Sequence, residues 1–231
     1  MTDRIGTLVA DSGYGVSAEQ RNKVLRNTYW LLSLSLVPTV LGAWFGVATG
    51  VGQYFSGVMG FVVFLAGAIG FIYAIEKTKN SGAGVPILLG FTFFMGLMLS
   101  RLIERTLGFS NGAELIMTAF GGTAGVFLVM SSMATVIKRD LSGMGKWLFV
   151  GVIVLLVGSV INLFVGSTAG MMAISMAAIG IFSAYMLYDI KRIIDGGETN
   201  YISATLALYL NIINVFQSLL ALLGVFGGER D

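Results

Sequence analysis

The sequence predicts an all-α integral membrane protein built as a bundle of seven transmembrane helices. Its composition is the first reason, because 56% of the 231 residues are hydrophobic and only 11% are charged. Soluble domains carry about 25% charged residues, and a soluble fold of this length could not hide so much apolar surface from water. The second reason is that the apolar residues gather in seven long runs, and the third is that Lys and Arg segregate among the gaps between those runs.

Residues 1–28 are polar and precede the first apolar run, so we expect them to form a cytoplasmic N-terminal tail. The basic residues of this stretch are Arg4, Arg21, Lys23 and Arg26. The stretch is too hydrophilic, and too long before the first apolar run, to be a cleavable signal peptide. We expect a membrane domain over residues 29–226 and a short external tail over residues 227–231.

A helix that crosses a bilayer needs about 20 mostly apolar residues, and seven segments meet this requirement. In chain order they cover residues 29–49, 56–75, 85–103, 113–136, 146–166, 170–190 and 203–226. These runs are long and continuous, whereas membrane β-barrels are built from alternating segments of about 10 residues. Both structures satisfy backbone hydrogen bonds in lipid, but only helices match the runs.

Glycine-rich or charged breaks separate most of the segments. They lie at residues 50–53, 76–82, 138–143, 166–168 and 195–200. The third segment carries Arg101, Glu104 and Arg105 at its outer end, where Arg101 and Glu104 can neutralise each other at i, i+3 spacing. The fourth segment begins near Glu114, whose charge complements the positive end of a helix dipole.

The distribution of Lys and Arg orients the bundle, because cytoplasmic loops are enriched in positive charge. Eleven of these residues lie in the N-terminal stretch or near the breaks that follow the second, fourth and sixth segments. The other three, Arg101, Arg105 and Arg230, lie on the opposite side. An even number of crossings would scramble this segregation, so we expect a cytoplasmic N-terminus and an external C-terminus.

Glycine is abundant, with 32 residues, and is often spaced by four. The pairs Gly42/Gly46, Gly46/Gly50 and Gly121/Gly125 resemble the small-residue motifs that let membrane helices approach closely. We expect these pairs to pack inside the bundle, and dimerisation through one of these faces is the alternative.

Cysteine and histidine are both absent, which removes disulfides, Cys or His metal sites and nucleophilic Cys or His catalysis. No lysine follows Lys191, so the last helix cannot hold a retinal Schiff base. No basic block indicates nucleic acid. The sequence therefore predicts no catalytic residue, no metal site and no cofactor, and a protein that is not an enzyme.

A few polar residues inside the apolar segments are the candidates for specific function, since such groups are costly at membrane depth. Asp189 lies near the end of the sixth segment, where it either pairs locally with Lys191 and Arg192 or responds to protons or cations at the inner end of a pore. Asn211, Asn214 and Ser218 share one face of the seventh segment. That polar stripe either makes interhelical hydrogen bonds or lines a pathway, and Asn162 in the fifth segment is a candidate partner for it.

The run Asp189–Tyr201, which contains Gly-Gly-Glu-Thr-Asn-Tyr, and the following Leu208-Tyr209-Leu210-Asn211 and Asn214-Val215-Phe216 resemble the Bax inhibitor-1 family, in particular its bacterial YccA-like branch. Further similar stretches are Val24–Tyr29, Gly121–Ala124 and Lys138–Ser142. The resemblance implies a seven-helix fold whose last helix is surrounded by the other six. It also implies that Asp189 occupies the first of two aspartate positions through which some members respond to pH as calcium leaks, while Asn211 occupies the second.

Two functions follow as hypotheses. The YccA-like branch implies an inner-membrane protein of bacteria that binds and restrains FtsH, a membrane-bound ATP-dependent protease, with residues 1–28 accessible to that protease. The alternative is a calcium or cation leak along the seventh segment. Because Asn211 cannot ionise, the coupled titration of two carboxylates is lost, which weakens the pH-gated leak.

Overall fold

The computed structural model describes residues 16–54 and 57–229, and this part of the chain forms seven long helices and no strand. The long helices are α2 (Ala18–Thr49), α3 (Gly57–Thr78), α4 (Gly84–Leu107), α5 (Gly112–Val136), α6 (Met144–Val165), α7 (Thr168–Ile194) and α8 (Tyr201–Phe226). Each is long and apolar enough to cross a membrane, because 22 residues already span about 33 Å. The prediction of an all-α, seven-span membrane bundle is therefore confirmed.

The helix ends follow from their capping residues. The Ser17 side chain accepts a hydrogen bond from the backbone N–H of Gln20 at 3.2 Å and caps the start of α2, and Gly50 ends this helix with a φ of 68°. The helix starts at Ala18, well before the apolar segment that begins at residue 29. Hydropathy identifies only the apolar part of a helix that lies in lipid. It therefore did not predict the polar turns of α2 that precede residue 29. Residues 1–15, also assigned to the N-terminal tail, and Arg230 lie outside the described residues.

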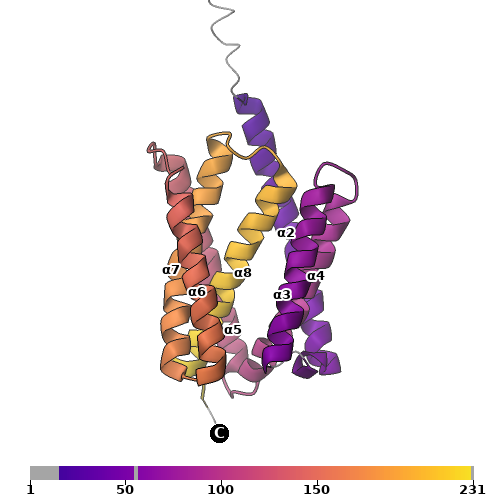
Figure 1. The fold of residues 1–231 in the computed structure, drawn as a ribbon, viewed down its shortest axis with the longest axis vertical. Coiled ribbons are helices and arrows are strands. Elements are labelled where there is room, and N and C mark those ends of the chain that lie inside the picture. The colour runs from indigo at the N-terminus through magenta and orange to yellow at the C-terminus, as the bar shows by residue number, and fades with distance from the viewer. Residues whose placement is uncertain (1–15, 55–56, 230–231) are drawn as a thin grey trace, which may run out of the picture.

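The last helix, α8, packs against α2, α3, α4, α5 and α7. Figure 1 shows it running obliquely, with α6 and α7 on one side and α3 and α4 on the other. Its side chains include several of the most deeply buried of the described residues, among them Leu208, Tyr209 and Leu220 at 0% exposure. By contrast, α6 packs mainly on α7 and turns large apolar side chains such as Trp147 and Phe164 outward.

The helices with the most extensive contact are α2 and α4, and glycine lets their backbones approach closely. A Cβ atom on Gly42 would clash with the backbone carbonyl oxygen of Phe93, and one on Gly96 would clash with that of Thr39. A Cβ atom on Gly46 would meet the side chain of Ser100. Packing inside the bundle is thus confirmed for the Gly42/Gly46 pair.

The Gly121/Gly125 pair behaves differently. Both residues are exposed on α5, and a Cβ atom added to either would meet nothing within 4 Å. The expectation that this pair packs tightly inside the bundle is wrong, because its face of α5 turns away from the neighbouring helices.

Candidate functional site

Asp189 of α7 and Asn211 of α8 meet between their helices. The Asn211 amide Nδ2 donates a hydrogen bond of 2.7 Å to the Asp189 carboxylate Oδ2. Asn211 is 5% exposed, and Asp189 is half-buried. The sequence singled out both residues, and the fold brings them into direct contact.

The two cations that follow Asp189 have other partners. Lys191 pairs with Asp195 at 2.5 Å, and Arg192 pairs with Glu198 at 3.4 Å. Asp189 forms no ion pair within 4 Å with a described residue. The expectation of a local ion pair between Asp189 and these cations is therefore wrong, because both side chains reach carboxylates in or beside the loop that ends α7.

A carboxylate held by a neutral amide can bind a proton or a cation, but the pair contains one titrating group. Two carboxylates at this spacing would share protons and titrate together. Among the described residues, no group of three or more Asp or Glu side chains is arranged to hold a metal ion. The chemistry that this arrangement offers is thus a single half-buried negative charge with one amide donor.

The other predicted polar residues do not join this pair. The Asn214 amide donates to the Leu210 carbonyl oxygen of its own helix at 2.7 Å, and Ser218 is half-buried farther along α8. Asn162 lies near the end of α6, with its Oδ1 beside Gly170 in the first turn of α7. Gly170 and Asp189 are 19 residues apart on one helix, which corresponds to about 28 Å. Asn162 is therefore at the opposite end of α7 from the Asp189–Asn211 pair.

A buried hydroxyl cluster lies on another face of α8. The hydroxyl groups of Tyr209 and Thr39 share a hydrogen bond of 2.8 Å, which links α8 to α2. The Tyr209 hydroxyl also lies 3.4 Å from the Thr92 carbonyl oxygen of α4, and the Phe91 ring packs edge-on against Tyr209. Sequence reasoning missed these residues because a tyrosine or threonine in an apolar helix is typical of ordinary core. The only feature of the sequence that pointed to this cluster was Tyr209 itself, two residues before Asn211.

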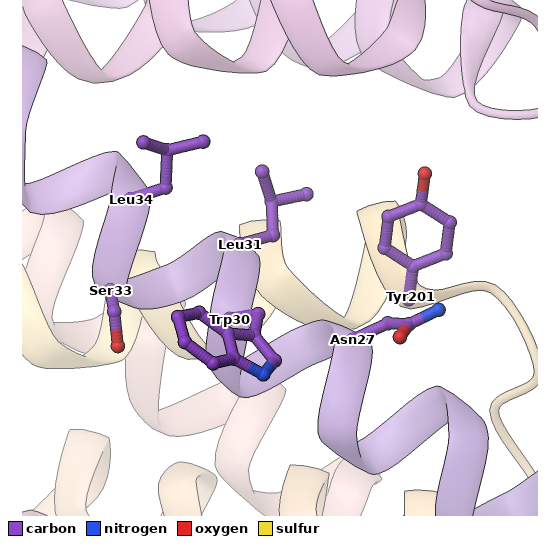
Figure 2. Close-up of a pocket in the computed structure, with 6 residues that line it drawn as sticks. All are labelled: Asn27, Trp30, Leu31, Ser33, Leu34 and Tyr201. Atoms are coloured by element: carbon purple, nitrogen blue, oxygen red, sulfur yellow. The ribbon is translucent and has the colours of Figure 1, made fainter.

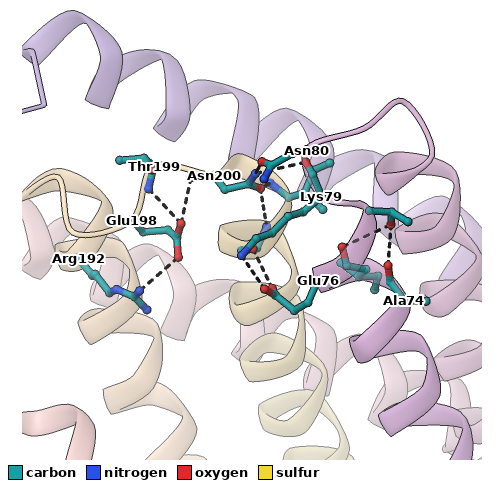
Figure 3. Close-up of polar contacts among 12 residues, drawn as sticks. Ala74, Glu76, Lys79, Asn80, Arg192, Glu198, Thr199 and Asn200 are labelled. Carbon is teal, nitrogen blue, oxygen red and sulfur yellow. Dashed lines mark hydrogen bonds and ion pairs between the residues drawn. The ribbon is translucent and has the colours of Figure 1, made fainter.

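The loop between α7 and α8 is held by a dense set of polar contacts (Figure 3). Glu198 accepts hydrogen bonds from the backbone N–H groups of Thr199 and Asn200 and pairs with Arg192. The Asn200 side chain caps α8 by accepting from the N–H groups of Ile202 and Ser203. Its amide also donates to the carbonyl oxygen of Lys79 and to Asn80 in the α3–α4 loop. The Gly-Gly-Glu-Thr-Asn run therefore has a structural role, because it begins α8 and ties it to the α3–α4 loop.

A polar loop also separates α5 from α6. The Ser142 backbone N–H and hydroxyl each donate to the Asp140 carboxylate at 2.8 Å. The backbone hydrogen bond from Ser142, helped by its hydroxyl, holds the pKa of Asp140 below its usual range. This exposed turn accounts for the Asp-Leu-Ser pattern without any ligand.

At the other end of the bundle, Glu104 accepts a hydrogen bond from the Gln53 side chain at 3.0 Å. Arg101 forms no ion pair within 4 Å with a described residue, so the expected Arg101–Glu104 pair is wrong. The helix spacing allowed that contact, but the 3-10 turn η1 (Val51–Tyr54) brings Gln53 to the glutamate.

Three surface cavities accompany these features, and none of them is lined by Asp189 or Asn211. One has a volume of about 400 Å³ and is lined by Gln53, Arg101, Glu104 and Arg105. The other two lie along α2 and share Asn27 and Tyr201 as lining residues. Figure 2 shows the apolar one of these two.

Most of this chain is similar to known proteins. The family model described as inhibitor of apoptosis-promoting Bax1 matches residues 21–228. A membrane protein of Vibrio cholerae is 42% identical over 91% of this chain and 92% of its own length. An Escherichia coli K12 protein named modulator of FtsH protease YccA is 37% identical over 94% of this chain and 96% of its own length. A Pseudomonas aeruginosa protein is 37% identical over 92% of this chain and 94% of its own length.

Proposed function

Because the chain belongs to the family of inhibitors of apoptosis-promoting Bax1, the Bax inhibitor-1 family, we propose that it is a non-enzymatic inner-membrane protein that modulates a membrane-bound, ATP-dependent protease of the FtsH type. The observation that carries this proposal is the 37% identity to the modulator of FtsH protease YccA, which extends over 94% of the chain. A match of that extent covers all seven helices, rather than one shared motif.

The geometry of α2 supports the proposal. This helix continues beyond the apolar segment to Ala18, and Arg21 donates to the Ile194 carbonyl oxygen at the end of α7 at 3.1 Å. The start of α2 is thereby fastened to the bundle on the side that the positive-inside rule assigns to the cytoplasm. We assign the contact with the protease to residues 1–15, which precede this helix in the sequence.

Co-purification and protein lifetimes test the proposal. We expect the tagged full chain to co-purify with FtsH and its overexpression to lengthen the half-life of an FtsH membrane substrate. Deletion of residues 1–15, which leaves α2 complete, should abolish both effects. The matched control replaces residues 1–15 with a Gly-Ser segment of equal length, which separates a sequence requirement from a length requirement. If the full chain neither co-purifies with FtsH nor changes the half-life, the proposal fails.

A second candidate function, a cation leak, is favoured by the Asp189–Asn211 contact. The family resemblance implies that the pair occupies two positions at which some members carry aspartates, and the pair places a half-buried carboxylate between α7 and α8. Reconstituted vesicles loaded with a calcium dye decide this alternative. Flux through the wild type that falls in Asp189→Asn would support it, and Asn211→Asp should add pH dependence because two carboxylates then share a proton. Equal, negligible flux for the wild type and both variants would eliminate the leak.

A further inference from the structure

A groove along α2 runs from the polar end of the helix into its apolar part. Its polar half is a cavity of about 440 Å³ whose lining includes Glu19, Gln20 and Lys23. Its apolar half is a cavity of about 490 Å³ whose lining includes Trp30, Leu31 and Leu34. Asn27 and Tyr201 line both halves, and we call the whole the α2 groove. None of its lining residues belongs to the Asp189–Asn211 pair.

The residues of α2 that line the groove change from charged to apolar along the helix. Glu19, Lys23 and Asn27 are spaced by four, Trp30 follows Asn27 by three and Leu34 follows Trp30 by four, so all of them share one face of α2. The charged positions precede residue 29, where the apolar run begins, and the apolar positions follow it. Trp30 is 73% exposed, as expected for an aromatic residue at the membrane–water boundary. The α2 groove therefore crosses that boundary.

Hydrogen-bond donors line the polar half of the α2 groove, and two of them, Asn27 and Tyr201, also line its apolar half. The side chains of Lys23 and Asn27 and the Tyr201 hydroxyl form no hydrogen bond or ion pair with any residue in the ranges 16–54 and 57–229. Asn27 and Tyr201 are nevertheless half-buried. An ammonium, an amide and a phenol that line one cavity and have no partner among the described residues suit the oxygens of a phosphate group. The Gly-Gly-Glu-Thr-Asn-Tyr run thus has a second use, because its tyrosine faces this groove (Figure 2).

We propose that the α2 groove binds one phosphatidylethanolamine molecule, with its phosphate at Lys23, Asn27 and Tyr201 and an acyl chain against Trp30, Leu31 and Leu34. Glu19 lies one turn beyond Lys23, about 6 Å farther toward water, where it can accept hydrogen bonds from the primary ammonium of the headgroup. The order of carboxylate, cation, neutral donors and apolar residues along α2 matches the order of ammonium, phosphate and acyl chain in this lipid.

A transmembrane helix of another protein fits the α2 groove less well. Such a helix would need an apolar hollow through the depth of the bilayer, about 30 Å. The apolar half of the α2 groove extends from Asn27 to Leu34, which is about 10 Å of helix. An acyl chain that enters at the boundary extends about 15 Å to the midplane, so its first part would lie in the α2 groove and the rest in the bilayer.

Native mass spectrometry of the purified full chain, delipidated and titrated with single lipids, tests the proposal. We expect one phosphatidylethanolamine to bind more tightly than phosphatidylcholine or phosphatidylglycerol. Lys23→Ala should weaken this binding about tenfold, the equivalent of one charge-assisted hydrogen bond, and Tyr201→Phe should weaken it less. Glu19→Gln should remove the preference for phosphatidylethanolamine over phosphatidylcholine, because phosphatidylcholine has no ammonium N–H to donate.

Arg26→Ala is the matched control, because it removes the same charge from the same helix outside the α2 groove. It should leave lipid binding unchanged, and thermal unfolding should show that all variants fold. Equal losses in Lys23→Ala and Arg26→Ala, or no preference among the three lipids in the wild type, would overturn the proposal. Crosslinking of residue 27 to a protein in cells, without any lipid adduct, would also overturn it. The measurement contains no protease, so its failure leaves the proposed modulation of FtsH untouched.

Discussion

Asn211 keeps a half-buried carboxylate hydrogen-bonded without neutralising its charge. The resemblance to the Bax inhibitor-1 family implies an aspartate at this position in some members, whereas this chain has an amide in contact with Asp189 at 2.7 Å. An amide in place of a carboxylate leaves the pair with one titrating group instead of two.

We expect Asn211→Ala to destabilise the protein by about 1–3 kcal/mol, because it leaves the Asp189 carboxylate half-buried without its donor. Asn214→Ala is the matched control on the same helix, one turn farther along. Its amide bonds only to the Leu210 carbonyl of α8 itself, so the loss should be smaller. Unfolding followed by circular dichroism in mild detergent measures both losses. Equal losses would show that the Asp189 contact contributes nothing specific.

The residues of the site were only partly predictable. Asp189 and Asn211 were identifiable because a charge and an amide are conspicuous in apolar helices. Their contact depends on how α7 and α8 are rotated and how they cross. The spacing of residues within one helix does not predict that arrangement. The same limit explains why Asn162 was paired with α8, although it faces the first turn of α7.

At the scale of helices, hydropathy located each membrane span but not its true ends. The α7 helix continues to Ile194 beyond the segment predicted to end at residue 190, and α4 continues to Leu107 beyond residue 103. These extra turns are rich in charged side chains, which suit water and still form helix. The Asn200 cap and the 3-10 turn after Gly50 depend on local hydrogen bonds. Hydropathy along the sequence therefore does not predict them.

Gly96→Ala should destabilise the α2–α4 pair by about 1–3 kcal/mol, because the new methyl group clashes with the Thr39 backbone carbonyl and forces the helices apart. Gly125→Ala is the matched control on an open face of α5. That variant should be neutral or slightly more stable, since alanine favours helix over glycine by about 1 kcal/mol. Thermal unfolding of the two variants measures the difference. A Gly96→Ala protein as stable as Gly125→Ala would contradict the close approach.

Asn200→Ala should cost about 1–2 kcal/mol, because α8 loses its N-cap and the α3–α4 loop loses two hydrogen bonds. Asn200→Asp separates these contributions, since aspartate still accepts from the Ile202 and Ser203 N–H groups but cannot donate to Lys79 or Asn80. We expect its stability to lie between those of the wild type and Asn200→Ala. Chemical denaturation in detergent measures the order of the three proteins, and any other order would refute the two roles given to Asn200.

For the whole molecule, the orientation of the bundle is the property with the most consequences. The proposed contact with a cytoplasmic protease requires the α3–α4 and α5–α6 loops to lie on the inner side of the membrane. The segregation of Lys and Arg predicts that orientation. The absence of native cysteine makes the orientation directly measurable.

Single-cysteine labelling tests the orientation. We expect Ser110→Cys, in the α4–α5 loop, to react with a membrane-impermeant maleimide on intact spheroplasts. Gly82→Cys and Gly143→Cys, in the α3–α4 and α5–α6 loops, should react only after the membrane is opened. All three positions are exposed, so burial does not account for a difference. The reverse labelling pattern would invert the molecule and remove the basis for a cytoplasmic N-terminal tail.

The position of α8 also has a consequence for how the protein is made. The ribosome synthesises Tyr201–Phe226 after every other span, yet this helix is the shared packing partner of α2, α3, α4, α5 and α7. Until α8 is inserted, those helices lack a shared packing partner. A premature stop codon between Ile194 and Tyr201 would leave six spans without that partner, and we expect the six-span product to be cleared by quality control.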